Sequence, residues 1–243
     1  MKSSDDARSN SGSTYYEKNQ AFNPLVRFLH GIRYKHLLTL FNDMASDDRL
    51  RVVDIGCAHA KVFQLLDSRF KIQYVGIELD KNFAEVAEQR YGAFENFKII
   101  NGLIQDNYSE LENADVVLAL ETLEHIPEHI VVRIVEKIAQ MSPKVFMCSV
   151  PNEVGPIIWI KNVGSLLMGY TRHKEYKWSE TFFAGIFDLD RIQTHGTTHK
   201  GFDWRWLAQT IRHNMKITNI YSTPISWLPK TLSASIIFIC VLK

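Results

Sequence analysis

Acidic and imidazole side chains stand at three places where their chemistry needs an explanation. Asp54 lies inside the apolar run RVVDI, where a lone carboxylate is unfavourable unless another group pairs with it. Glu78 lies 24 positions after Asp54, at the end of a second apolar run, QYVGIEL, just before its last residue, Leu79. The third place is the pattern E-x-x-E-H, formed by Glu121, Glu124 and His125. Carboxylate and imidazole ligands together suit Mg²⁺, Mn²⁺ or Zn²⁺.

The residues around Asp54 predict a strand that leads into a ligand-binding turn. Its neighbours in the run are apolar and mostly β-branched, as in a strand covered on both faces. Residues 56–60 are small except for His59, so the backbone can approach a ligand closely, and a helix that begins there offers N–H groups. Open α/β sheets bind nucleotides at the carboxyl end of the first strand, which is this position.

The stretch 54–60 resembles motif I of the class I S-adenosylmethionine-dependent methyltransferases, D-x-G-x-G-x-G, and Asp54 and Gly56 match it. Ala58 and Ala60 replace the second and third glycines of the family. Because alanine disfavours positive φ, we expect right-handed, extended or slightly remodelled backbone there. Glu78 matches the acid that ends the family's second strand and accepts hydrogen bonds from the ribose hydroxyls.

This resemblance is strong from Arg51 to Pro151 and weaker from there to Lys243. It implies S-adenosyl-L-methionine as the cofactor. Where the family has an acid for the adenine amino group, this chain has Leu103 and Ile104, so we expect a backbone N–H and apolar stacking by Ile104 instead. The implied cofactor-binding residues are Asp54, Gly56, Cys57, Ala58, Glu78, Leu79, Ile104 and Leu120.

The E-x-x-E-H pattern allows two interpretations. Glu124 and His125 either cap the next helix and form local hydrogen bonds, or belong to a metal site. The pattern resembles the ubiquinone-biosynthesis O-methyltransferases, where it is linked to a divalent metal, and bacterial small-RNA 2′-O-methyltransferases, where a later histidine completes the site. His199, in HKGFDW, is the candidate for that later ligand, although the RNA enzymes have H-x-F-E-W. The tentative Mg²⁺ or Mn²⁺ ligands are Glu121, Glu124, His125 and His199; the candidate catalytic bases are His125 and His199.

Hydrophobic periodicity predicts the elements that position these residues. The expected fold is a Rossmann-like, seven-stranded α/β methyltransferase sheet with helices on both faces and an antiparallel last strand. Residues 1–13 are expected to be a disordered tail. Residues 14–48 are expected to be a helical lid with two helices broken near Gly31, and 49–243 the methyltransferase domain, with a substrate-side insertion at about 152–200. Expected strands after the first cover 73–79, 97–103, 114–120, 144–150, 217–221 and 235–242. Expected helices cover 61–70, 81–91 and 203–213, and another helix begins at Pro127. Residues 171–198 are expected to be a loop region.

Composition narrows the choice of compartment and partner. The formal net charge is +1, so no overall field draws the chain to nucleic acid, and the RNA alternative is disfavoured without being excluded. Three cysteines in apolar runs, an odd number, favour buried thiols and a reducing cytoplasm. The apolar stretch 155–170 is either core or a patch for peripheral membrane contact.

The sequence therefore predicts methyl transfer to a hydroxyl of a small-molecule, lipid-linked or glycan acceptor. One alternative is a metal-dependent RNA 2′-O-methyltransferase. An alternative of another class is a non-catalytic, methyltransferase-like binding module, which the alanines of the turn leave open.

Overall fold

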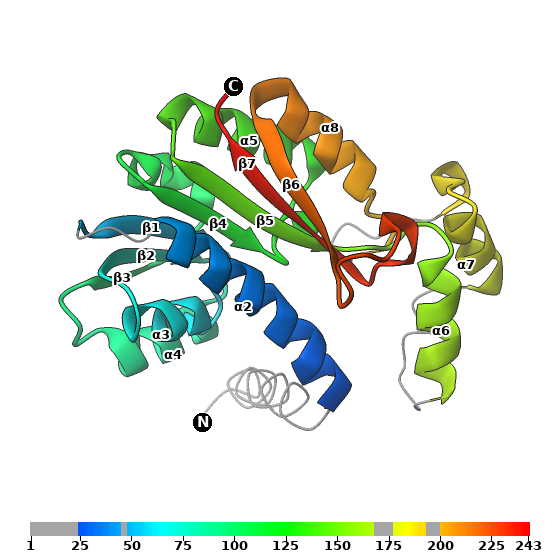
Figure 1. Ribbon diagram of the computed structural model, residues 1–243, viewed down its shortest axis with the longest axis horizontal. Coiled ribbons are helices and arrows are strands. Elements are labelled where there is room, and N and C mark those ends of the chain that lie inside the picture. Colours follow the sequence, from blue (N-terminus) through cyan, green and yellow to red (C-terminus); the bar gives the residue numbers. More distant parts are fainter. Residues whose placement is uncertain (1–23, 45–47, 168–176, 193–199) are drawn as a thin grey trace, which may run out of the picture. The chain divides into compact units, whose positions relative to one another are not determined.

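The protein is described by a computed structural model that places residues 24–44, 48–167, 177–192 and 200–243 (Figure 1). Two compact units divide the chain, Met1–Leu118 and Ala119–Lys243. The strand order is β3-β2-β1-β4-β5-β7-β6, and the sheet has seven strands. Strand β7 runs antiparallel to β5 and to β6, which confirms the predicted sheet with its antiparallel last strand.

The first unit alternates strands and helices. Its elements are α2 (Pro24–Met44), β1 (Leu50–Ile55), α3 (Lys61–Asp67), β2 (Ile72–Glu78), α4 (Lys81–Tyr91), β3 (Phe97–Asn101) and the 3-10 turns η1 (Ile104–Asp106) and η2 (Tyr108–Leu111). Strand β1 pairs in parallel with β2, and Asp54 is opposite Gly76. Parallel strands place their carboxyl ends at one edge, so the turn after β1 and the end of β2 are neighbours.

Aromatic rings fill the core of the first unit between α3, β2 and β3. Phe63 packs against Tyr74, Tyr91 and Phe97, with ring centroids 4.8–5.6 Å apart across the cluster. This packing fixes the position of β2, and with it the place where Glu78 ends the strand.

Helix α2 is continuous through Gly31, so the prediction of two helices broken there is wrong. A glycine in a helix interior is unfavourable by only about 1 kcal/mol relative to alanine. The buried residues Leu37, Leu40 and Phe41, at helical spacing, and the contact of Phe41 with Phe70 hold the helix on its neighbours. Whether residues 14–48 act as a lid stays a prediction.

Strand β4 (Val116–Leu120) ends at the beginning of the second unit. The remaining elements are η3 (Leu123–His125), α5 (Glu128–Met141), β5 (Val145–Pro151), α6 (Ile157–Leu167), α7 (Trp178–Gly185), η5 (Leu189–Arg191), α8 (Trp204–Asn214), β6 (Lys216–Thr223), η6 (Lys230–Leu232) and β7 (Ser235–Val241). None of the helices among the described residues has the length and apolarity that a membrane span requires.

Helix α7 lies inside the region 171–198 that was expected to be a loop, so that prediction is wrong for residues 178–185. The reason is an inverted pattern: the buried residues of α7 include Glu180 and Thr181, whereas Trp178 and Phe182 are exposed. Apolar periodicity could not identify a helix whose inner face is polar.

Candidate functional site

The turn that follows β1 has a strained backbone. Gly56, Ala58 and Ala60 have φ angles of 70°, 47° and 52°, all in the left-handed region. The expectation that alanine would impose right-handed or extended geometry at Ala58 and Ala60 is therefore wrong. An L-residue in this conformation is less stable by roughly 1–2 kcal/mol, and strain of this kind is typical of ligand-binding segments.

Replacing Ala58 with glycine is expected to raise the free energy of unfolding by about 0.5–1 kcal/mol. Glycine removes the left-handed strain, and its greater freedom in the unfolded chain offsets part of the gain. Ala139→Gly, in the right-handed helix α5, is the matched control and should lower the same free energy by about 1 kcal/mol. Urea unfolding without ligand measures both, and a loss of stability in Ala58→Gly would contradict the assigned strain.

Glu78 holds the turn from the end of β2. The backbone N–H of Ala58 donates to its Oε2 at 2.7 Å, and the N–H of Asp80 donates to its Oε1 at 2.8 Å. Burial raises the pKa of the Glu78 carboxyl, while these backbone hydrogen bonds lower it. The predicted position of Glu78 at the end of the second strand is confirmed. A carboxylate has about four acceptor positions, so this group is able to accept from ribose hydroxyls as well.

Asp54 is almost fully buried in β1. The hydroxyl of Tyr74 donates to its Oδ2 at 2.7 Å, which gives the buried carboxylate the partner that the sequence demanded. Burial raises the pKa of Asp54 to about 7; the Tyr74 hydrogen bond lowers it, the Glu78 charge raises it, and the positive charge of Arg33 lowers it. This acid can therefore respond to a bound cation near neutral pH.

Cys57 is part of the packing of the turn. A Cβ added at Gly76 would lie 2.6 Å from the Cys57 Sγ, so only glycine fits beside the thiol. Burial raises the pKa of Cys57 well above its usual value, which disfavours the nucleophilic thiolate. All three cysteines are buried and free, as predicted.

The ends of β2 and β3 present aliphatic side chains. Leu79 and Leu103 are exposed, whereas Ile104 is buried in η1. Asn101 donates from Nδ2 to the carbonyl oxygens of Glu78 and Leu79 and so fixes the backbone there. The adenine contact of Ile104 and the cofactor role of Leu79 stay predictions, and Leu103 joins them as an exposed apolar candidate.

The E-x-x-E-H residues, Glu121, Glu124 and His125, belong to the second unit. Glu121 has a φ of 56° and precedes η3, so the three side chains do not share one continuous helical turn. Its Oε1 accepts from the hydroxyls of Ser149 (3.0 Å) and Ser235 (2.7 Å). These bonds tie Glu121 to β5 and β7, while Glu124 is buried. The cofactor role of Leu120, at the end of β4, stays a prediction.

The tentative metal site is not assembled by the described residues. Within the ranges that the structure covers, no three His, Cys, Asp or Glu side chains are arranged to hold a metal ion. His199 lies outside the described residues, so the set of Glu121, Glu124, His125 and His199 is not tested as a whole. The roles of His125 and His199 as bases stay predictions.

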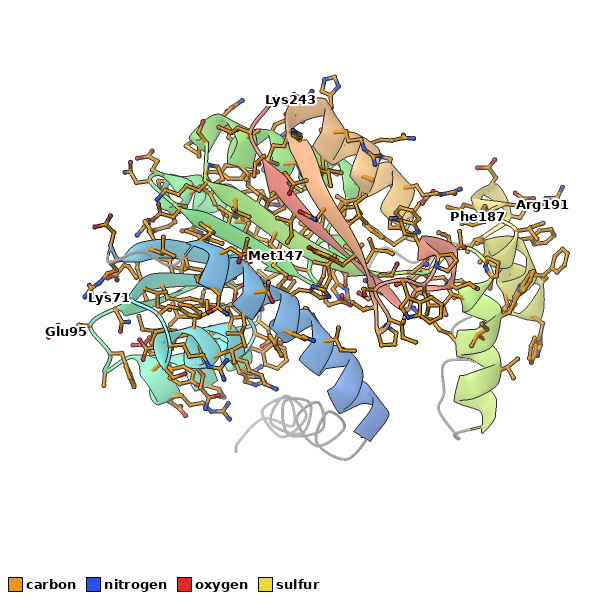
Figure 2. The ribbon with its side chains drawn as sticks, viewed as in Figure 1. Lys71, Glu95, Met147, Phe187, Arg191 and Lys243 are labelled. Carbon is orange, nitrogen blue, oxygen red and sulfur yellow. The ribbon has the colours of Figure 1, made fainter. Side chains whose placement is uncertain are left out.

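The neighbours of His199 in HKGFDW have clear packing roles. Lys200 donates from Nζ to both carboxylate oxygens of Glu180, at 2.8 and 2.9 Å, and both side chains are buried. Asp203 caps α8 and pairs with Arg205, whose guanidinium lies 4.4 Å from the ring centroid of Phe187, labelled in Figure 2. The stretch therefore anchors α7 and α8.

Sequence reasoning missed four residues that act on Asp54, Cys57 or the end of β2. Tyr74 binds Asp54, Gly76 makes room for Cys57, Asn101 holds two carbonyls, and Arg33 acts on the charge of Asp54. Tyr74 and Gly76 could be recognised only from the pairing register of β1 and β2, which the structure provides. In the sequence alone, the hint was the small residue Gly76 within the second apolar run.

Comparison with known proteins identifies a methyltransferase domain within the chain. Residues 52–142 match the family model described as a methyltransferase domain. The small RNA 2′-O-methyltransferase of Drosophila melanogaster is 27% identical over 168 residues, covering 62% of this chain and 42% of that protein. The ribosomal RNA small subunit methyltransferase A of Persephonella marina is also 27% identical, over 63% of this chain and 53% of its own. The chain thus spans about half the length of the curated relatives it matches.

Solved structures show the same fold. Magnesium protoporphyrin IX methyltransferase from Synechocystis PCC 6803, with bound S-adenosylhomocysteine, has a TM-score of 0.63 at 13% identity and covers 99% of this chain and 100% of its own. The methyltransferase domain of bacterial CtHen1 has a TM-score of 0.57 at 13% identity, with 88% and 100% covered. Residues 52–142 are thus matched as a methyltransferase domain, and the seven-stranded sheet has the fold of the class I S-adenosylmethionine-dependent methyltransferases.

Proposed function

We propose that this chain transfers the methyl group of S-adenosylmethionine to a hydroxyl oxygen. The observation that carries the donor assignment is the Glu78 carboxylate, which lies at hydrogen-bonding distance from the Gly56–Ala60 turn. When bound, the cofactor supplies a methyl carbon made electrophilic by its sulfonium. Glu78 would accept from the ribose hydroxyls, and Asp54 would balance the positive amino group.

The chain's remaining task is to position the acceptor and remove its proton. The acceptor oxygen forms a bond to the methyl carbon while the bond from carbon to sulfur breaks, and the hydroxyl proton passes to a base. His125 and His199 are the candidate bases, and a neutral imidazole can take a proton near pH 7. Mg²⁺ or Mn²⁺ bound by Glu121, Glu124 and these histidines would instead lower the pKa of the hydroxyl.

Glu78→Gln is expected to weaken binding of S-adenosylhomocysteine by about 10- to 100-fold. A hydrogen bond to a charged acceptor contributes about 1.5–3 kcal/mol, and glutamine also brings an NH₂ group against backbone N–H donors. Calorimetric titration measures the affinity. Glu95→Gln, an exposed acid, is the matched control and should bind as the wild type does. Equal affinity in the two variants would contradict the donor assignment.

Binding of the donor also separates an enzyme from a binding module. Wild-type protein that fails to bind S-adenosylmethionine at millimolar concentration would favour the non-catalytic alternative. Binding without methyl transfer to any acceptor would leave the donor site assigned and remove the proposed base chemistry.

For the acceptor, we favour a small-molecule, lipid-linked or glycan hydroxyl. The net charge of +1 offers little attraction to polyphosphate, and exposed apolar side chains on α6 and α7 suit a lipid-linked molecule. An RNA 2′-hydroxyl is the second candidate, supported by the fly relative, a small RNA 2′-O-methyltransferase.

Tritium from labelled S-adenosylmethionine distinguishes the acceptors. Label in the organic phase of a lipid extract, or in released glycan, supports the first candidate. Label in RNA that ends in a 2′-hydroxyl, and not in RNA with a 2′-deoxy end, supports the second. RNA binding should then fall steeply with salt, since phosphate contacts release counterions. Repeating the assay with Mn²⁺, Mg²⁺ or chelator, and with Glu124→Gln, tests the metal.

A further inference from the structure

Helices α6 and α7 lie side by side (Figure 1), joined by hydrogen bonds and by a buried apolar cluster that contains Ile158 and Ala184. Asn162 of α6 donates from Nδ2 to the Oγ1 of Thr181 of α7 at 2.6 Å, and both residues are buried. The indole N–H of Trp159 donates to the carbonyl oxygen of Thr181 at 3.1 Å. Hydrogen bonds therefore add to the apolar packing that holds the pair on its inner side.

The outer side of the same pair is apolar. We call the side chains of Trp159, Ile160, Val163, Trp178, Phe182 and Ile186 the α6–α7 apolar face. Ile160 is 60% exposed, Trp178 64% and Phe182 55%. Trp178 and Phe182 of α7 and Ile186 at its C-cap are spaced i, i+4 and i+8, and the rings of Trp159 and Phe182 stack with centroids 6.5 Å apart. An exposed, continuous apolar face of this kind marks an interaction surface.

The charged groups around this face are a cation before α7 and two acids after it, of which Asp188 pairs with Arg191 and Asp190 is exposed. The sequences of α6 and α7 contain one acidic residue, Glu180, and its carboxylate is buried against Lys200. Lys177, exposed at the N-cap of α7, stands directly before Trp178. Anionic lipid attracts lysine and arginine near its surface and disfavours exposed carboxylates. Tryptophan with a neighbouring cation is typical of segments that lie at the boundary between water and acyl chains.

We propose that the α6–α7 apolar face docks on a lipid bilayer that contains anionic lipid. The helices have 11 and 8 residues and so extend about 12–17 Å, which suits a pair that lies in the plane of the interface. Trp178, Phe182 and Ile160 enter the acyl boundary, and Lys177 stays among the headgroups. The face joins the exposed apolar residues of α6 to those of α7 and its C-cap. Docking is independent of the donor site, so the two proposals can fail separately.

Vesicle flotation tests the docking. Wild-type protein is expected to float with vesicles of phosphatidylcholine containing about a third phosphatidylglycerol, and less with pure phosphatidylcholine. Trp178→Ser and Phe182→Ser should each lower the partition coefficient by about tenfold, because each removes one large apolar side chain from the interface. Both residues are exposed, so the variants should fold, and circular dichroism checks that they do.

The matched control is Leu242→Ser, an exposed apolar residue after β7, which should float as the wild type does. Trp178→Phe gives a second reading: it should still dock, while quenching of tryptophan fluorescence by brominated lipid decreases. Absence of wild-type flotation, or equal flotation of Phe182→Ser, would overturn the proposal. Light scattering that shows a dimer lost in the same variants would assign the face to a second copy of the chain instead. Glu78→Gln should float normally.

Discussion

Lys200→Met is expected to lower the free energy of unfolding by about 3–5 kcal/mol. Removal of the ammonium leaves the Glu180 carboxylate buried without the cation that now lies 2.8 Å away, and an uncompensated buried charge is strongly destabilising. The backbone N–H of Lys177 also donates to Glu180, so the same carboxylate fixes the start of α7. Urea unfolding near pH 7 measures the loss.

A double variant separates charge from packing. Lys200→Met combined with Glu180→Gln should recover much of the lost stability, because glutamine can still accept at the helix start and no buried charge remains. Lys81→Met, in an exposed ion pair with Glu85, is the matched control and should change stability little. A loss in Lys200→Met no larger than in this control would contradict the buried pair. If the double variant were no more stable than Lys200→Met alone, the loss would come from packing and not from the buried charge.

The parallel part of the fold was predictable because its signals are local. Buried parallel strands appear in a sequence as short β-branched runs. The run that contains Asp54 lies in the observed β1, and the run that contains Glu78 lies in the observed β2. Helix α4 was predicted with its observed bounds from its amphipathic pattern, and in the structure Asp80 caps its start. These elements position Asp54, Glu78 and the turn between β1 and α3, so the placement of these residues was predictable, while their role in binding the donor stays a prediction.

The rest depended on contacts between residues far apart in the sequence. The left-handed φ of Ala58 is imposed by the turn, in which its N–H must meet Glu78, and overrides the preference of alanine. Tyr74 became a partner of Asp54 through strand register. Helix α7 escaped detection because Glu180 faces inward to meet Lys200, so tertiary pairing reversed the usual pattern.

Asp54 is expected to make the ligand-free protein less stable as pH rises from 5 to 8. Its folded pKa is about 7, and an unfolded aspartate has a pKa of about 3.9, so the folded chain holds a proton that unfolding releases in this window. The stabilisation is complete below pH 4 and is lost as pH rises through 7. The change between pH 5 and pH 8 is about 2–3 kcal/mol. Glu78, whose pKa is also raised, acts in the same direction.

Asp54→Asn isolates this effect, because asparagine can still accept from the Tyr74 hydroxyl and carries no charge. Urea unfolding at several pH values should show the variant gaining on the wild type as pH rises, with Glu95→Gln following the wild type. A bound ligand shifts the protonation of Asp54 in the opposite direction, because the positive amino group of S-adenosylhomocysteine favours the ionised carboxylate. Wild-type affinity for S-adenosylhomocysteine should therefore rise by up to about tenfold between pH 5.5 and 7. The Asp54→Asn affinity should be weaker and nearly independent of pH. Parallel pH curves for the two proteins would show that Asp54 neither titrates in this range nor meets the amino group.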